Sequence, residues 1–252
     1  MPLLDSLRRI DHGRPVSQIL FYRLWYWVLL LLFTLIYRAR FSNTAAVPDS
    51  GGLLVIANHQ SHLDPPLVGL AIRRRNMAAI ARAGLFRVPV LGWWLRAVGC
   101  ISIKEDAGDA GAMRAAIEQL KLGRLVVIFP EGSRSPDGSL QEFKRGVWVM
   151  MMRSGAPVLP AAVEGCFDAM PRSRRLPRIF GQRVAVAFGT PIPHAELKAL
   201  GADAGLARLA TEVDALRLDL RERLRTATRG RVPRPGPGDR AWSPEAGAQP
   251  VA

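Results

Sequence analysis

From residue 51 onward, short apolar runs alternate with longer segments of helical periodicity, and this alternation constrains the fold most strongly. Short apolar runs are typical of buried strands, and the segments between them are long enough for helices that cover a sheet. We therefore expect an α/β domain. The expected strands are 53–57, 77–81, 100–103, 125–129, 158–163 and 184–188, and the expected helices are 65–74, 89–98, 110–122, 142–153 and 206–225.

An uncharged apolar stretch, LWYWVLLLLFTLIY, occupies residues 24–37. At about 1.5 Å per residue it covers about two-thirds of a bilayer core of about 30 Å. Extending it back to Ile19 approaches spanning length but takes in Arg23, whose side chain would have to snorkel to the interface. The aromatic and arginine residues at both ends favour a membrane segment. It either spans the bilayer or lies half-buried in its surface, and the alternative to both is a buried core helix.

The chain has 252 residues and a formal net charge of +14, which favours a phosphate-bearing partner, either nucleic acid or an anionic lipid surface. Its two cysteines, Cys100 and Cys166, are too few for a disulfide framework or a zinc site. The arginine-rich stretch 172–183 is expected either to lie against anionic lipid or to be a solvated basic face. The sequence divides into a membrane-associated helical segment (1–48), an α/β domain (49–225) and a basic Pro/Gly-rich tail expected to be disordered (226–252).

The first cluster of chemically active side chains, NHQSHLDPP at 58–66, directly follows the strand expected at 53–57. Asp64 precedes a proline, which disfavours helical backbone, so we expect it in the turn that leads into the next helix. From there its carboxylate can bond one ring nitrogen of His59, and the other nitrogen can take a proton from an alcohol. The alternatives are a helix cap made by Asp64 and a metal site made by His59, His62 and Asp64. No further ligand cluster completes such a site, so we expect no metal.

The second cluster, FPEGSRS at 129–135, directly follows the strand expected at 125–129. Open α/β sheets bind ligands in loops at the carboxyl ends of strands. Arg134 can hold a phosphate through two parallel hydrogen bonds, and the helix expected near Glu142 would add free amides and a positive dipole. Glu131, a carboxylate in an anion-binding loop, needs a local partner such as an arginine or a substrate hydroxyl. The alternative is a generic Gly/Ser turn.

Taken together, these blocks resemble the glycerolipid acyltransferases, and within them the bacterial 1-acylglycerol-3-phosphate acyltransferases. That family has an H-x4-D block, here NHQSHLD, followed by an F-P-E-G-[ST]-R-S block, here FPEGSRS. Further similarity runs through residues 85–94 and 158–165, so that the resemblance covers about residues 50–190. It implies a mixed, mostly parallel sheet flanked by helices.

The resemblance also implies an activity, which is transfer of a fatty acyl group from acyl-CoA or acyl carrier protein to the free hydroxyl of 1-acylglycerol-3-phosphate. The product would be phosphatidic acid, formed without a cofactor and without an acyl-enzyme. His59 is implied as the general base and Asp64 as its orienting partner. The residues implied to hold the glycerol phosphate and the anionic headgroup are Glu131, Gly132, Ser133, Arg134, Arg82 and Lys144.

The implied partners are a lysophospholipid, an acyl thioester with acyl carrier protein as one donor, and a membrane surface with anionic lipids, but not nucleic acid. The implied location is the bacterial inner membrane, with the catalytic domain on the cytoplasmic side. One departure concerns the family's second block, which usually ends in an arginine that meets the phosphate, whereas residues 99–105 read GCISIKE. Lys104 is an imperfect substitute for that arginine, and Glu105 favours another acceptor such as a lyso-ornithine lipid. A non-catalytic basic protein that binds a membrane or nucleic acid is the alternative from another class.

Overall fold

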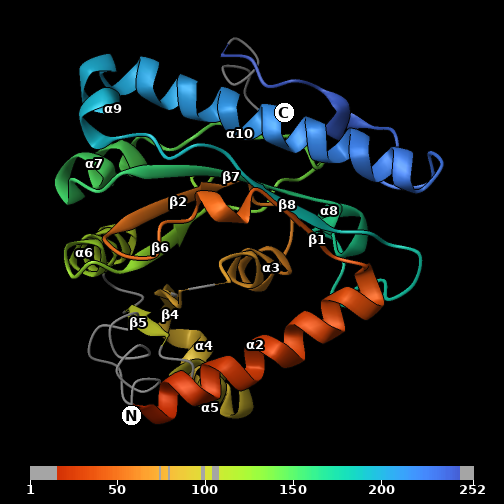
Figure 1. The fold of residues 1–252 in the computed structure, drawn as a ribbon, viewed down its shortest axis with the longest axis horizontal. Coiled ribbons are helices and arrows are strands. Elements are labelled where there is room, and N and C mark those ends of the chain that lie inside the picture. The colour runs from red at the N-terminus through yellow and green to blue at the C-terminus, as the bar shows by residue number, and fades with distance from the viewer. Residues whose placement is uncertain (1–15, 74, 79, 98–99, 104–107, 245–252) are drawn as a thin grey trace.

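The computed structural model describes residues 16–73, 75–78, 80–97, 100–103 and 108–244 (Figure 1). At its centre lies a six-stranded sheet with the order β1-β8-β7-β2-β6-β3. The pairs are parallel except β7 with β8, which run antiparallel. The predicted mixed, mostly parallel sheet is therefore confirmed. Its strands are β1 (Arg40–Ser42), β2 (Leu53–Ala57), β3 (Met77–Ala78), β6 (Leu125–Ile128), β7 (Val158–Glu164) and β8 (Ala185–Phe188).

A separate two-stranded parallel sheet joins β4 (Ile80–Arg82) to β5 (Ile101–Ile103). The single strand expected at 77–81 is therefore wrong, because β3 pairs with β6 in the main sheet whereas β4 pairs with β5. An apolar run shows that a segment is extended, but it does not show which neighbour the segment bonds to.

Helices cover both faces of the main sheet (Figure 1). Side chains of α2, α3 and α8 pack on one face, and those of α6, α7, α9 and α10 pack on the other. The five helices expected from the sequence are present with shifted ends, while the short α4, α8 and α9 and the edge strand β1 were not expected. The helices are α2 (Val16–Tyr37), α3 (Asp64–Ala71), α4 (Ala83–Arg87), α5 (Pro89–Ala97), α6 (Gly108–Lys121), α7 (Arg145–Ser154), α8 (Cys166–Ala169), α9 (His194–Leu200) and α10 (Ala202–Ala227), with 3₁₀ turns η1 (Thr44–Ala46) and η3 (Pro237–Asp239).

Strand β2 lies in the middle of the sheet and explains why its sequence is a continuous apolar run. Leu53 and Val55 face the α2–α3 layer, whereas Leu54 and Ile56 face the α6–α7 layer. All four side chains are no more than 1% exposed. A strand buried on both faces has no polar side, so the run LLVIA lacks the alternation of a half-exposed strand.

Among the described residues, one helix, α2, is long and apolar enough to cross a membrane. Its 22 residues extend the apolar stretch 24–37 and include Arg23. Large apolar side chains along it are exposed, so the alternative of a buried core helix does not fit. The exposed ones are Leu20, Leu24, Trp27, Val28, Leu31, Leu32 and Leu35.

The segment that follows α10 is packed up to residue 244, although the sequence indicated a disordered tail over 226–252. Arg217 of α10 donates hydrogen bonds to the carbonyls of Gly238 and Arg240, and Arg221 donates one to Arg234. The segment contains few apolar side chains, and buried guanidiniums of α10 bind its backbone instead. The expectation of disorder is therefore wrong for 226–244, and residues 245–252 lie outside the described residues.

Candidate functional site

The two sequence blocks meet at one edge of the main sheet. Strand β2 is parallel to both β6 and β7, so the carboxyl ends of the three strands point the same way. Residues 58–63 follow β2, residues 129–144 follow β6, and α8 follows β7. The backbone N–H of Ser135 donates to the His59 carbonyl at 2.7 Å, which ties the second block to the first. This edge is where an open α/β sheet positions its ligands.

His59 and Asp64 form a hydrogen-bonded pair at this edge. His59 Nδ1 lies 2.9 Å from Asp64 Oδ2, and the Asp64 side chain is fully buried while that of His59 is 16% exposed. The same carboxylate oxygen accepts the backbone N–H groups of Gln60 and Ser61, each at 2.6 Å. With Nδ1–H donated to the carboxylate, Nε2 keeps its lone pair and can accept a proton.

Asp64 is the first residue of α3. Its Oδ2 binds His59, Gln60 and Ser61, and its Oδ1 has no hydrogen-bond partner among the described residues, so neither oxygen accepts an amide of the helix. The carboxylate points back to the loop, so the helix-cap alternative is wrong. The His59 ring also stacks on Phe129, with ring centres 4.3 Å apart. Phe129 opens the second block, and this stacking is a support for the imidazole that the sequence analysis missed. In the described part of the chain, no three His, Cys, Asp or Glu side chains are grouped as metal ligands.

Glu131 supports the loop that carries His59. Its side chain is buried, and its two carboxylate oxygens accept the backbone N–H groups of His59, at 2.5 Å, and Gln141, at 3.0 Å. Among the described residues no arginine pairs with this carboxylate, and two backbone amides bind it instead. Burial raises the pKa of Glu131 to about 8, against the opposing effect of the two amides. Glu131 thus lies beneath the site and holds the His59 backbone in place.

The raised pKa of Glu131 predicts a pH dependence of stability. Between about 4.5, the ordinary value, and about 8 the folded protein holds a proton that the unfolded chain has released. Stability therefore falls as pH rises through this window, by at most about 1.4 kcal/mol per pH unit, and is fully retained below it. Urea unfolding at pH 5, 6, 7 and 8 is expected to show this fall in the wild type and its absence in Glu131→Gln.

The matched control is Glu118→Gln, which removes an exposed carboxylate from α6 and is expected to follow the wild-type curve. Parallel pH profiles for the wild type and Glu131→Gln would contradict the raised pKa.

Arg134 lies beside the His59 loop with an unused donor. Its side chain is half-buried, and its buried Nη1 has no hydrogen-bond partner among the described residues. Burial, followed by the nearby Arg134 guanidinium and His59, lowers the pKa of His62, which places the arginine next to the H-x4-D loop. A buried donor without a partner is costly, and a phosphate oxygen would satisfy it.

Gly132 and Lys144 lie against each other beside Arg134. Gly132 has φ +72°, and a Cβ built there would lie 2.5 Å from Lys144 Cε, so the lysine side chain crosses directly over the glycine. Lys144 precedes α7, and its backbone N–H donates to the carbonyl of Pro130 at 2.9 Å. Ser133 is exposed in the same loop. The structure therefore brings together the loop residues expected to bind phosphate.

The remaining expected residues do not belong to this loop. Arg82 ends β4, in the separate two-stranded sheet. Lys104 and Glu105, which carry the departure from the family pattern, lie outside the described residues.

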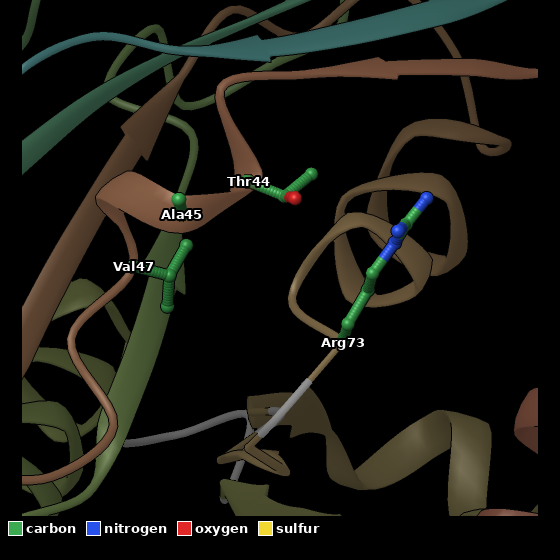
Figure 2. Close-up of a pocket in the computed structure, with 4 residues that line it drawn as sticks. All are labelled: Thr44, Ala45, Val47 and Arg73. Carbon is green, nitrogen blue, oxygen red and sulfur yellow. The ribbon is translucent and has the colours of Figure 1, made fainter.

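A hollow of about 170 Å³ lies elsewhere, between η1 and Arg73, which follows α3 (Figure 2). Arg73 and three small side chains, Thr44, Ala45 and Val47, line it. None of these four residues is an acid, a histidine or a cysteine.

Comparison with known proteins finds one matching family model and several related enzymes. The family model for acyltransferases matches residues 38–164. A chloroplastic 1-acyl-sn-glycerol-3-phosphate acyltransferase of Brassica napus is 33% identical over 118 residues, which are 46% of this chain and 34% of that protein. The corresponding enzyme of Streptococcus pneumoniae is 26% identical over 188 residues, which are 74% of this chain and 67% of that protein.

A lyso-ornithine lipid O-acyltransferase of Pseudomonas aeruginosa is 28% identical over 167 residues, 66% of this chain and 62% of that protein. The matches to the plant relatives, in contrast, span little more than a third of those proteins. The crystal structure of the 1-acyl-sn-glycerophosphate acyltransferase of Thermotoga maritima aligns with a TM-score of 0.63 at 24% identity. That alignment covers 92% of this chain and 87% of the other, and it shows a shared fold.

Proposed function

This chain belongs to the acyltransferase family, and on that premise we propose that it acylates the free hydroxyl of a lysophospholipid, with 1-acylglycerol-3-phosphate as acceptor and phosphatidic acid as product. The observation that carries the proposal is the His59–Asp64 pair, at 2.9 Å, on the same sheet edge as the Arg134 loop. The pair supplies a base for an alcohol, and the loop supplies donors for a phosphate. Relatives named for this reaction in plants and bacteria support the acceptor.

His59 acts as the general base in the proposed reaction. Nε2 removes the proton of the acceptor hydroxyl as its oxygen attacks the thioester carbonyl, and an ester C–O bond forms as the C–S bond breaks. The proton then passes from the imidazolium to the leaving thiolate. Such assistance typically contributes about 10² to 10⁴ in rate, and alignment of two bound substrates contributes much of the rest. No acyl-enzyme and no cofactor take part.

Arg134 binds the acceptor phosphate through its unused donor, with Lys144 and the amides around Gly132 beside it. Arg134→Ala is expected to raise KM for lysophosphatidic acid by roughly 10- to 100-fold, since a hydrogen bond to a charged group contributes about 1.5–3 kcal/mol. Arg134→Lys should recover part of the loss, because lysine keeps the charge but not the planar pair of donors. Steady-state kinetics with the lysolipid varied is the measurement.

The control is Arg145→Ala. Arg145 is the exposed first residue of α7 and pairs with Asp203. The KM of this variant is expected to equal that of the wild type. An Arg134→Ala enzyme with wild-type KM would remove this residue from the phosphate site.

A panel of acceptors and donors tests the proposed function itself. Purified enzyme is supplied with lysophosphatidic acid, lyso-ornithine lipid and neutral lysolipids, each with acyl-CoA and with acyl carrier protein as donor. We expect the highest kcat/KM with lysophosphatidic acid. A clear preference for lyso-ornithine lipid would support the second candidate, which the Pseudomonas aeruginosa relative and Glu105 favour. No transfer to any acceptor would favour a non-catalytic binding protein.

Membrane association forms part of the proposal, and α2 is the element that supports it. Phe33 and Tyr37 near its end are buried in the core with α3, and Gln18 near its start donates to the Arg96 carbonyl of α5 at 3.5 Å. The Tyr26 hydroxyl donates to the Leu70 carbonyl of α3 at 3.2 Å. A helix held along its length by the domain suits the plane of the interface better than a crossing of the bilayer. We place it at the cytoplasmic face of a bacterial inner membrane.

Helix α5 continues the apolar surface beside the first half of α2. Phe21 and Trp93 meet edge to face with ring centres 5.3 Å apart, and Trp25 and Trp94 meet in the same way at 6.1 Å. An apolar groove of about 520 Å³ runs between these helices and reaches Pro66, two residues beyond Asp64. In the proposed reaction this groove holds a substrate acyl chain beside Pro66, which belongs to the helix that begins with Asp64.

A further inference from the structure

Residues 171–183, between α8 and β8, expose large apolar side chains next to arginines. The segment reads PRSRRLPRIFGQR and contains no acidic residue, helix or strand. Leu176 is 75% exposed, Ile179 is 49% exposed and Phe180 is 88% exposed. Three large apolar side chains close together in water mark a contact surface. The family model ends at residue 164, so the segment lies outside the region it matches.

The segment lies between the end of α2 and the catalytic loop. At its far end, the backbone N–H of Val184 donates to the carbonyl of Tyr37, the last residue of α2. At its near end, the Ser61 hydroxyl donates to the Met170 carbonyl at 2.9 Å. Figure 1 shows this connection beside the C-terminal end of α2. A partner bound by this segment would therefore lie next to the loop that carries His59 and Asp64.

The charges around the segment are of one sign. Strand β1 pairs with β8 in parallel, with Arg40 opposite Ala185, which brings Arg183 near Arg38 and Arg40. Burial, followed by the guanidiniums of Arg38, Arg40 and Arg231, lowers the pKa of Arg183. None of these four arginines forms an ion pair within the described ranges. A cluster of like charges favours an anionic partner.

Building on the proposed function, we propose that segment 171–183 is a second membrane-contact element, separate from α2. Leu176, Ile179 and Phe180 enter the acyl layer of an anionic phospholipid surface, and the surrounding arginines bind lipid phosphates. A bilayer fits better than an acidic protein such as acyl carrier protein, because the segment ends beside α2, which exposes the large apolar side chains of Leu31 and Leu35 near the same end. Through Ser61 and Met170, this contact holds the catalytic loop at the depth of the lysolipid headgroup.

A fluorescent label at position 180 tests the contact. Phe180→Cys is prepared in a Cys100→Ser background and labelled with an environment-sensitive dye, and Cys166 does not compete because burial raises the pKa of its thiol. On vesicles of phosphatidylcholine and phosphatidylglycerol, we expect a blue shift and a severalfold fall in quenching by iodide. Leu122→Cys, at an exposed apolar position after α6, is the matched control and should keep its aqueous signal.

Position 180 remaining as accessible to iodide as position 122, in protein that sediments with the vesicles, would overturn the proposal for this segment alone. A dye response to acyl carrier protein with none to vesicles would overturn it in favour of a protein partner. Protein that fails to sediment with vesicles would refute both this segment and the membrane association proposed for α2.

A charge variant tests the arginines independently. Arg174→Gln/Arg175→Gln is expected to need roughly 25-fold more anionic vesicles for half-maximal binding, since each basic side chain near such a surface contributes about fivefold. Arg114→Gln/Arg153→Gln removes the same charge from exposed positions on α6 and α7 and should bind as the wild type does. Equal binding by the two double variants would overturn the role of the arginines.

Acyl transfer in detergent micelles should be unchanged in both double variants. A wild-type enzyme inactive in micelles would refute the proposed activity, while the dye and vesicle readouts would still decide the membrane contact.

Discussion

His59→Ala is expected to lower kcat of acyl transfer by about 10² to 10⁴, the range typical of a lost general base. KM for the lysolipid should change little, because the phosphate donors around Arg134 remain in place. Asp64→Asn is expected to lose activity as well. The buried carboxylate oxygen holds His59 Nδ1 at 2.9 Å together with two backbone amides, and an asparagine that turns its amide nitrogen toward them leaves donors facing donors.

The control for this prediction is His194→Ala, which removes a histidine from the start of α9, on the opposite face of the sheet from α3. Its kcat should match that of the wild type. Lysolipid binding by His59→Ala, measured by fluorescence titration, separates a chemical defect from a folding defect. A His59→Ala enzyme with the wild-type kcat would show that the pair is structural.

Arg217→Ala is expected to destabilise the fold by about 3–5 kcal/mol, because removal of one member of a buried ion pair leaves the other charges buried without it. The Arg217 side chain is fully buried, donates to Asp214 Oδ1 at 2.7 Å and lies 3.8 Å from Glu164 Oε2. It also binds the carbonyls of Gly238 and Arg240 in the segment after α10. The measurement is the free energy of unfolding from urea denaturation.

The control for this second prediction is Arg223→Ala, on the same helix, which breaks an exposed pair with Asp219. Its cost should stay within about 1 kcal/mol, since exposed ion pairs contribute little. Equal costs at the two positions would contradict the assignment of a buried network.

The buried network also reaches the active loop. Arg221 Nη1 lies 2.8 Å from Glu164 Oε1, and Gln60 Nε2 donates to Glu164 Oε2 at 3.1 Å. Gln60 follows His59 in the chain, so the network connects α10 and the segment after it with the His59–Asp64 pair. Arg217→Ala therefore tests two things, which are the stability of the fold and the support that this network gives to the loop carrying His59.

The sequence could predict where the two site loops lie, because each loop directly follows a strand a few residues earlier in the chain. The apolar run 53–57 favours a buried strand, and Pro65 suits the first turn of a helix. A strand, a short loop and a helix start separated by few residues bring His59 and Asp64 together with little freedom. The same reasoning identified the run 125–129, of which β6 forms Leu125–Ile128, and the loop that follows it. Parallel pairing of these two strands then brings the blocks to one edge.

What the sequence did not reveal depends on contacts between distant residues. Glu131 is balanced by backbone amides of residues 59 and 141, and no residue pattern announces a backbone partner. The segment after α10 has the composition of a disordered tail, yet it is ordered by two buried arginines of that helix. The split of residues 77–82 between two sheets is likewise set by which strands lie alongside, not by local propensity.

In the proposed mechanism the acceptor hydroxyl, deprotonated by His59, attacks the thioester directly. A single-turnover reaction with labelled acyl-CoA, quenched with and without lysophosphatidic acid, tests this most directly. Direct attack predicts that free CoA appears only when the acceptor is present, in step with phosphatidic acid, and that no label stays on the protein. Release of one equivalent of CoA without acceptor, with the acyl label retained on the protein, would contradict it.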